Sequence, residues 1–151
     1  MALVLDIIRT DGTAWIEIAV AFVAYYLVSF LWWGPLFGRM WGRQVGMDMT
    51  ERPDGKTMGI ALLLQAVGTF LLAYVLWHVM VAFTVDLDTG MMTNPTVAAA
   101  MQGVFFTWLG FFVPVQLGRV AWEKSSWTLF GINAGGHLVG LVAMGLAFSL
   151  L

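Results

Sequence analysis

Cysteine is absent from this sequence, so the chain forms neither disulfide bonds nor thiolate metal sites. Charged residues are scarce at 11% of the chain, against about 25% in ordinary globular domains. The formal net charge is −2, and without a basic excess nucleic acid is not an expected partner. The sequence also lacks a phosphate-binding loop, a His-Glu-x-x-His pair and a serine nucleophile elbow. These absences favour a protein that is not an enzyme and has no metal site.

The chain is instead dominated by apolar residues. Hydrophobic residues make up 60% of it, with eight tryptophans and ten methionines, and the mean hydropathy is +0.85. This composition leaves too little polar surface to cover a water-soluble core in a chain of 151 residues. The sequence therefore predicts a membrane protein with a single domain that comprises residues 1–151.

Four apolar stretches cover about residues 15–37, 58–83, 96–118 and 127–150. Each is longer than the ~20 residues that an α-helix needs to cross ~30 Å of hydrocarbon. No lysine or arginine lies in any of them, and the one acidic residue, Glu17, lies in the first turn of the first stretch. Helices of a soluble protein would show polar faces, which are nearly absent here. We therefore predict an all-α fold, an integral membrane bundle of four transmembrane helices.

Two local signals refine these helices. Pro114 lies inside the third stretch, where its ring would clash with the carbonyl of Gly110 and kink the helix. Ser125 and Ser126 precede the fourth stretch and can cap the helix N-terminus.

The basic residues predict an orientation. Six of the seven lie in the two loops on one side of the predicted bundle: Arg39, Arg43, Arg52, Lys56, Arg119 and Lys124. Only Arg9 lies on the other side. Because loops rich in lysine and arginine stay in the cytoplasm, we expect both termini outside, an N-out/C-out topology.

The segment WWGPLFGRMWGR, residues 32–43, joins the first span to the first basic loop. Its Gly-Pro pair ends the span, and we expect a short interfacial helix over residues 38–47. Tryptophans and arginines at this depth anchor a protein at the lipid headgroups. The predicted anchor residues, which fix the depth of the protein in preference to recognising a particular lipid, are Trp33, Pro35, Arg39, Trp41 and Arg43.

Three stretches together, WWGPLFGRMWGRQVGM, GFFVPVQLG and WTLFGINAGGHLVGLVAMG, resemble a bacterial family of small four-helix membrane proteins. This family is known as domain of unknown function seventeen-sixty-one, and the resemblance extends from about residue 15 to the end. It implies a multi-pass protein of the bacterial cytoplasmic (inner) membrane but no activity. The family tends to carry aromatic residues after Asn-Ala-Gly, whereas this chain has Gly136 and His137. A role for His137 is therefore not implied by the resemblance.

Polar residues inside the spans are the candidates for a functional site, because each is costly in hydrocarbon unless it is paired. Asn133 and His137 are four residues apart and share a helix face, and Gln102 and Gln116 fall on one stripe of the third span. Such residues either hydrogen-bond between helices or serve a ligand, proton or cofactor. The candidate intramembrane polar site is Asn133, His137, Gln65, Gln102, Gln116 and Glu17. Close helix packing is predicted at Gly131, Gly135, Gly136 and Gly140.

Haem is the cofactor that two histidines in a four-helix membrane bundle suggest. By helix rise, His78 lies about 8 Å from the outer end of its span and His137 about 20 Å from the outer end of its own. One iron would need both at nearly the same depth, so no haem is expected.

The sequence therefore favours a membrane protein that acts through self-assembly, as a homo-oligomer, or as an accessory component of a larger membrane complex. Membrane lipids are the other expected partner. One alternative is a small homo-oligomeric transporter or channel, coupled to protons or cations, with Glu17, Asn133 and His137 near its path. A second alternative is an intramembrane cofactor-binding protein.

Overall fold

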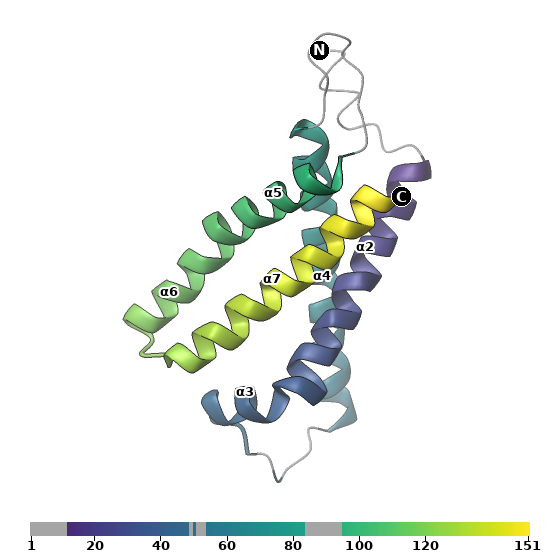
Figure 1. The fold of residues 1–151 in the computed structure, drawn as a ribbon. Helices are drawn as coiled ribbons and strands as arrows, with labels where there is room; N and C mark the ends of the chain where they lie inside the picture. Colours follow the sequence, from purple (N-terminus) through teal and green to yellow (C-terminus); the bar gives the residue numbers. More distant parts are fainter. Residues whose placement is uncertain (1–11, 49, 51–53, 84–94) are drawn as a thin grey trace.

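The computed structural model describes residues 12–48, 50, 54–83 and 95–151, and the statements below concern these residues (Figure 1). It is helical, and no strand occurs in the ranges described. Its elements in chain order are α2 (Gly12–Leu31), η1 (Trp32–Leu36), α3 (Gly38–Gln44), α4 (Gly55–Phe83), α5 (Val97–Thr107), η2 (Trp108–Phe112), α6 (Val113–Trp122) and α7 (Trp127–Leu150).

Four helical stretches are long and apolar enough to cross a membrane: Trp15–Leu36, Gly55–Met80, Val97–Trp122 and Trp127–Leu150. The predicted all-α fold with four such helices is thus confirmed. The second begins three residues earlier than the sequence predicted, and the third continues four residues further.

Helix α7 is the centre of the bundle. Ten of its 24 residues are buried, which is more than in any other helix of the described chain. It packs against α2 on one side and against the α5–η2–α6 rod on the other (Figure 1). The apolar core between these helices includes Tyr25, Leu141 and Met144, each at most 2% exposed.

Both prolines inside the spans are accommodated by a wide helical turn. Pro35 lies within the π-helix η1, where Phe37 N donates to Trp32 O over five residues at 2.9 Å. Pro114 is the second residue of α6, which follows the π-helix η2 directly. A π turn holds one more residue than an α turn. It therefore accommodates a proline, which has no N–H for the regular hydrogen-bond pattern, and it rotates the face of the helix that follows. The kink predicted at Pro114 is therefore realised as a π turn.

The segment after η1 folds as the predicted short helix, α3 (Gly38–Gln44). Gly38 is required at its start, because a Cβ there would lie 2.6 Å from the Trp33 carbonyl oxygen. The position of α3 at a membrane surface stays a prediction. After the loop, Asp54 accepts hydrogen bonds at the start of α4, and the one from the Thr57 hydroxyl lowers the pKa of its carboxyl.

Ser126 caps α7, as predicted, and its hydroxyl also ties α7 to α3. Its Oγ accepts from Leu129 N at 3.0 Å and donates to Gln44 Oε1 at 2.5 Å. We expect Ser126→Ala to lower the free energy of unfolding by about 1 kcal/mol, because the first turn of α7 loses its acceptor. Chemical unfolding in bicelles measures this. The Ser125 side chain makes no hydrogen bond to the described residues, so Ser125→Ala should leave stability unchanged; equal losses for both variants would contradict the prediction.

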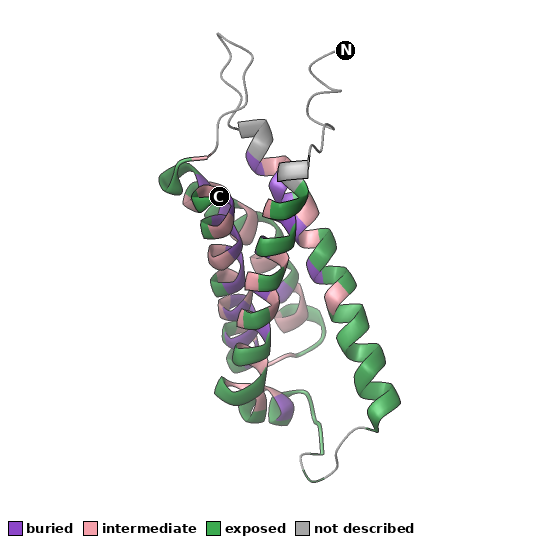
Figure 2. Ribbon diagram, turned by 90° about the vertical axis from the view of Figure 1, so that its right-hand side faces the viewer, coloured by how far each residue is buried: buried purple, intermediate pink, exposed green. Residues whose placement is uncertain are grey.

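Helix α4 contributes buried residues over only half of its length. From Thr69 to Met80 it contributes buried residues, and Met80 reaches the neighbourhood of Gly103 on α5. No residue from Gly55 to Gly68 is buried, including those on the side that continues the packed face. Figure 2 shows this lower half of α4 as exposed along its length. The buried residues of α4 are therefore confined to its C-terminal half, while its N-terminal half contacts α2 where Tyr26 Oη donates to the Leu62 carbonyl at 3.3 Å.

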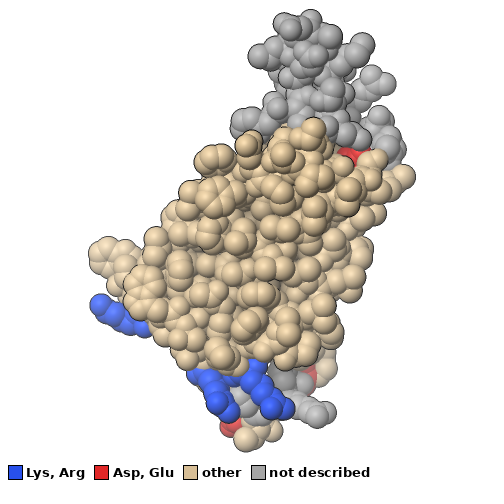
Figure 3. All heavy atoms as spheres, in the orientation of Figure 1, with Lys and Arg blue, Asp and Glu red and all other residues tan. Residues whose placement is uncertain are grey.

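The described basic residues gather at the lower end of the molecule as oriented in Figure 1, at the ends of α3, α4 and α6 (Figure 3). They are Arg39, Arg43, Lys56, Arg119 and Lys124. The other two that entered the orientation argument, Arg9 and Arg52, lie outside the described residues.

Candidate functional site

A buried tyrosine and a histidine meet near the middle of α7. Tyr25 Oη lies 2.6 Å from His137 Nδ1, which joins α2 to α7. Tyr25 is 2% exposed, whereas His137 is half-buried. His137 lies ten residues from the start of α7 and 13 from its end, about 15 and 20 Å along the axis.

The tautomer of His137 depends on the direction of its hydrogen bond with Tyr25. The Tyr25 hydroxyl is enclosed, and Nδ1 of His137 is its hydrogen-bond partner in the described structure. When the Tyr25 hydroxyl donates to Nδ1, the neutral imidazole carries its hydrogen on Nε2. Nε2 makes no hydrogen bond to the described residues and is not among the enclosed polar atoms. In this tautomer Nε2–H is a donor without a partner among the described residues.

One turn below His137, an amide chain crosses three helical segments. The Trp33 indole Nε1 donates to Asn133 Oδ1 at 3.3 Å. Asn133 Nδ2 in turn donates to Gln116 Oε1 at 3.4 Å, and both amides are buried. Each bond is at the long end of the hydrogen-bond range. Together they tie η1 and α6 to the same point of α7.

Two further indoles dock on the α7 backbone. Trp32 Nε1 donates to the Ile132 carbonyl at 2.9 Å, and Trp108 Nε1 donates to the Ala134 carbonyl at 2.8 Å. Both tryptophans begin a π-helix. The π-helices η1 and η2 thus place indole N–H groups against backbone carbonyls of α7 from two sides. The sequence placed Trp32 and Trp33 in an interfacial belt, whereas the structure directs both indole N–H groups into the bundle.

The glycines of α7 make room for these rings. A Cβ at Gly136 would lie 2.7 Å from atoms of both Trp32 and Trp33, and one at Gly140 would overlap the Tyr25 ring. Gly135 borders Trp32 at 3.2 Å. Gly131 has no atom within 4 Å of its Cβ position. At Gly135, Gly136 and Gly140 close approach is therefore made to aromatic side chains of α2 and η1, whereas a Cβ at Gly145 would lie 2.7 Å from Val104 of α5.

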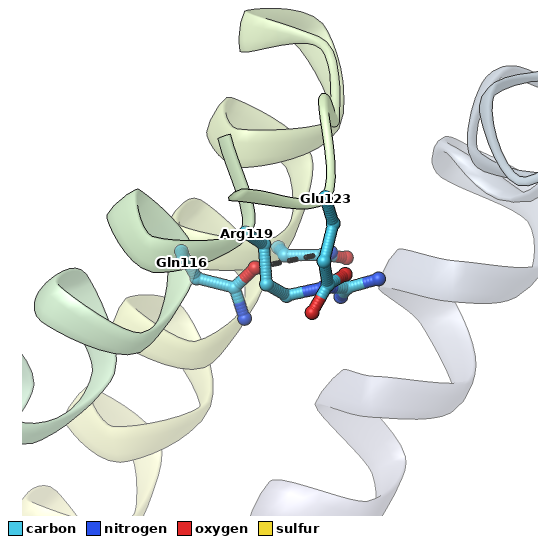
Figure 4. Close-up of polar contacts among 4 residues, drawn as sticks. Gln116, Arg119 and Glu123 are labelled. Carbon is cyan, nitrogen blue, oxygen red and sulfur yellow. Dashed lines mark hydrogen bonds and ion pairs between the residues drawn. The ribbon is translucent and has the colours of Figure 1, made fainter. Parts of the chain in front are cut away.

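The amide chain ends near a surface ion pair. Gln116, Arg119 and Glu123 follow one another at the end of α6 (Figure 4). Arg119 Nε donates to Glu123 Oε2 at 2.9 Å, and both side chains are more than a third exposed. The pair contributes little stability because water screens it.

The remaining predicted site residues lie elsewhere. Glu17 Oε2 accepts from Trp77 Nε1 at 2.7 Å, which ties α2 to α4 two turns above Tyr25. Gln65 is exposed, and its amide donates to Thr69 Oγ1 of the same helix at 3.3 Å. Gln102 is exposed on α5. Of the six candidates, the structure brings together Asn133, His137 and Gln116.

The second histidine, His78, lies apart from Asn133, His137 and Gln116. His78 Nδ1 lies 2.8 Å from the carbonyl of Tyr74 one turn earlier in α4. In the described part of the chain, no three of the His, Asp or Glu side chains cluster in a way that could hold a metal ion.

The residues around His137 are called the cluster below. Asn133, His137 and Gln116 were candidates from the sequence, and Trp33 was a predicted anchor. Sequence reasoning missed four further members: Tyr25, Ser29, Trp108 and Phe112. Tyr25, Ser29 and Trp33 recur every four residues, and this spacing marks one face of α2. The spacing of Gly136 and Gly140 on α7 matches it. This pairing is the signal that could have found Tyr25 and Ser29, whereas nothing comparable marked Trp108 and Phe112.

The cluster can hold groups in place and donate a hydrogen bond. It offers the Nε2–H of His137, two aromatic rings beside that imidazole, and neutral amides. It contains no carboxylate or ammonium group, and the serine and tyrosine hydroxyls in it are enclosed. It has the chemistry of a binding or register-fixing site.

Comparison with known proteins gives a family without an activity. The family described as "Protein of unknown function (DUF1761)" matches residues 16–149. No curated protein and no solved structure shows a significant match to the chain.

Proposed function

This chain belongs to the DUF1761 family, and we propose that it acts without catalysis, as a membrane protein that associates with further copies of itself. In this proposal it resides in the bacterial cytoplasmic membrane with both termini outside. The observation that carries the proposal is the lower half of α4, where no residue from Gly55 to Gly68 is buried.

The exposed half of α4 carries a polar group at a depth where lipid cannot satisfy it. Gln65 lies ten residues into the helix, about 15 Å from its start. Its amide is exposed and makes one long hydrogen bond, to Thr69. A partly satisfied amide near the middle of the hydrocarbon is costly, so a neighbouring protein surface is favoured there.

The stripe around Gln65 suits a second copy of the same helix. Ala61, Gln65 and Gly68 lie on one face, all three are exposed, and no atom lies within 4 Å of a Cβ at Gly68. Small residues let two helix backbones approach closely. A glutamine amide is both donor and acceptor, so this face can pair with itself across a two-fold axis.

The distribution of charge supports the proposed orientation. All five described lysines and arginines lie at the lower end of the bundle. With this end in the cytoplasm, Arg39 and Arg43 of α3 are exposed at the level of the lipid phosphates. In this proposal α3 lies in the membrane interface and anchors the protein.

Engineered cysteines test the association, because the natural chain has none. We expect Ala61→Cys and Gly68→Cys to form disulfide-linked dimers in native membranes on oxidation. Leu63→Cys is the matched control: it is 64% exposed on the opposite side of the same helix turn and should form few dimers. Gel mobility and intact mass measure the products. Equal crosslinking at all three positions, or none, would contradict the proposed interface, and adducts with other proteins alone would favour an accessory subunit.

A small transporter has less support. Its motivation was a path near Glu17, Asn133 and His137. Glu17 is hydrogen-bonded to Trp77 and lies eight residues from Tyr25 along α2, about 12 Å away by helix rise. No polar residue that would connect it to His137 is buried on α2 between Glu17 and Tyr25.

A further inference from the structure

His137 is less buried than the residues above it on the same face of α7. Helical spacing places Asn133, His137, Met144 and Phe148 on the interior face of α7. Met144 and Phe148, above His137, are at most 2% exposed. At the level of His137 and below, the opposing side is the part of α4 that has no buried residue, and His137 is only half-buried. The imidazole is therefore only partly covered by the packed helices.

The second ring nitrogen of His137, Nε2, has no hydrogen-bond partner among the described residues. With the Tyr25 hydroxyl as donor to Nδ1, the imidazole hydrogen is on Nε2. The hydroxyl of Tyr25 cannot move away easily, because its ring fills the space left by Gly140. This arrangement holds the imidazole as a carboxylate or carbonyl does in other sites, where the bond at one ring nitrogen sets the state of the other.

Aromatic rings border the same imidazole. The Phe112 ring centre lies 4.7 Å from that of His137, and the Trp33 ring centre lies 5.2 Å away. Ser29, between Tyr25 and Trp33 on the same face of α2, is 7% exposed, and its hydroxyl has no hydrogen-bond partner in the described structure. A buried hydroxyl without a partner is uncommon and indicates unused polar capacity beside the site.

We propose that these residues bind an uncharged, lipid-soluble carbonyl compound with a planar ring, of the quinone class, and that His137 Nε2–H donates to its carbonyl oxygen. The depth selects a molecule that dissolves in hydrocarbon. The cluster has no charged side chain to balance an ionic ligand. The free group is a donor, so it selects an acceptor, and Phe112 and Trp33 offer aromatic contact to a ring. This site and the proposed association both lie beside the exposed half of α4, where Gln65 is one turn from the buried Thr69. The residues that would bind the carbonyl compound are on α2, η1, η2 and α7, whereas the proposed dimer contact is on α4.

The test uses ¹⁵N-histidine labelling in nanodiscs, because the chain has two histidines and therefore a simple spectrum. Duroquinone is the probe, and durene, which has the same methylated ring without carbonyls, is the matched control. We expect duroquinone to shift the His137 Nε2–H signal saturably and to leave His78 unmoved, and durene to shift neither. An equal shift with durene, a shift that never saturates, or no shift at His137 would overturn the proposal.

Three variants sharpen the result. His137→Phe keeps a ring and removes the donor, so duroquinone should bind about tenfold more weakly to it. Tyr25→Phe should bring the two ring-nitrogen signals of His137 toward the tautomer average without any ligand. Tyr26→Phe is its neighbouring control, because Tyr26 Oη donates to the Leu62 carbonyl and not to His137. Unchanged duroquinone binding in a folded His137→Phe would overturn the proposal, and if this variant does not fold, the wild-type titration decides alone.

Discussion

Replacing Gly136 by alanine is expected to lower the free energy of unfolding by about 1–3 kcal/mol. The new Cβ would lie 2.7 Å from Trp32 Cδ1 and Nε1 and 2.7 Å from Trp33 Cη2. Neither indole can withdraw freely, because each donates a hydrogen bond to α7. The substitution therefore forces either a shift of α2 or the loss of one of these bonds. Reversible unfolding in bicelles, monitored by steric trapping, measures the change in the free energy of unfolding.

Gly131→Ala is the control for this experiment. Gly131 lies in the same helix, five residues earlier, and its Cβ position is open. Alanine is the better helix former by about 1 kcal/mol, so this variant should be neutral or slightly more stable. Equal destabilisation by the two alanines would show that the contact with Trp32 and Trp33 does not explain the need for glycine at position 136.

Replacing Asn133 by leucine is the second change with a large expected effect. Leucine nearly conserves the volume but leaves the indole N–H of Trp33 and the amide oxygen of Gln116 without their partner. An unsatisfied buried polar group costs about 1–3 kcal/mol, whereas hydrogen bonds inside membranes average about 0.6 kcal/mol. Because both bonds here are long, we expect a loss of about 1–3 kcal/mol for the two together. The same unfolding assay applies.

A second substitution separates the lost bonds from other effects. Adding Gln116→Leu to Asn133→Leu removes both members of the amide pair, and stability should partly recover because no amide then remains unpaired. Gln102→Leu, on an exposed surface of α5, should cost nothing. A double variant that is as unstable as the sum of its singles would contradict the amide pairing.

Hydropathy and charge determined much of this protein from the sequence. Four apolar runs without lysine or arginine predicted the four long helices, because each helix closes its own backbone hydrogen bonds and needs only local information. Ser126 was predictable as a cap for the same reason. Loops rich in arginine and lysine were local features too, and they lie together at one end of the fold.

The buried face of each helix, and the residues that it contacts, could be identified only from the tertiary structure. Gln102 and Gln116 share a stripe on an ideal helix, yet Gln102 is exposed and Gln116 is buried. The cause is η2, which lies between them and rotates the helix face by one extra residue. Periodicity counted at 3.6 residues per turn cannot include such a turn.

The contacts of the candidate site were also beyond a reading of the sequence. His137 and Tyr25 are 112 residues apart, and their pairing depends on how α2 crosses α7. Asn133 was a candidate from its cost in hydrocarbon alone, but its partners Trp33 and Gln116 come from two other segments. Local sequence fixes what each helix must hide or satisfy, and the packing of the helices decides which residue of another helix does so.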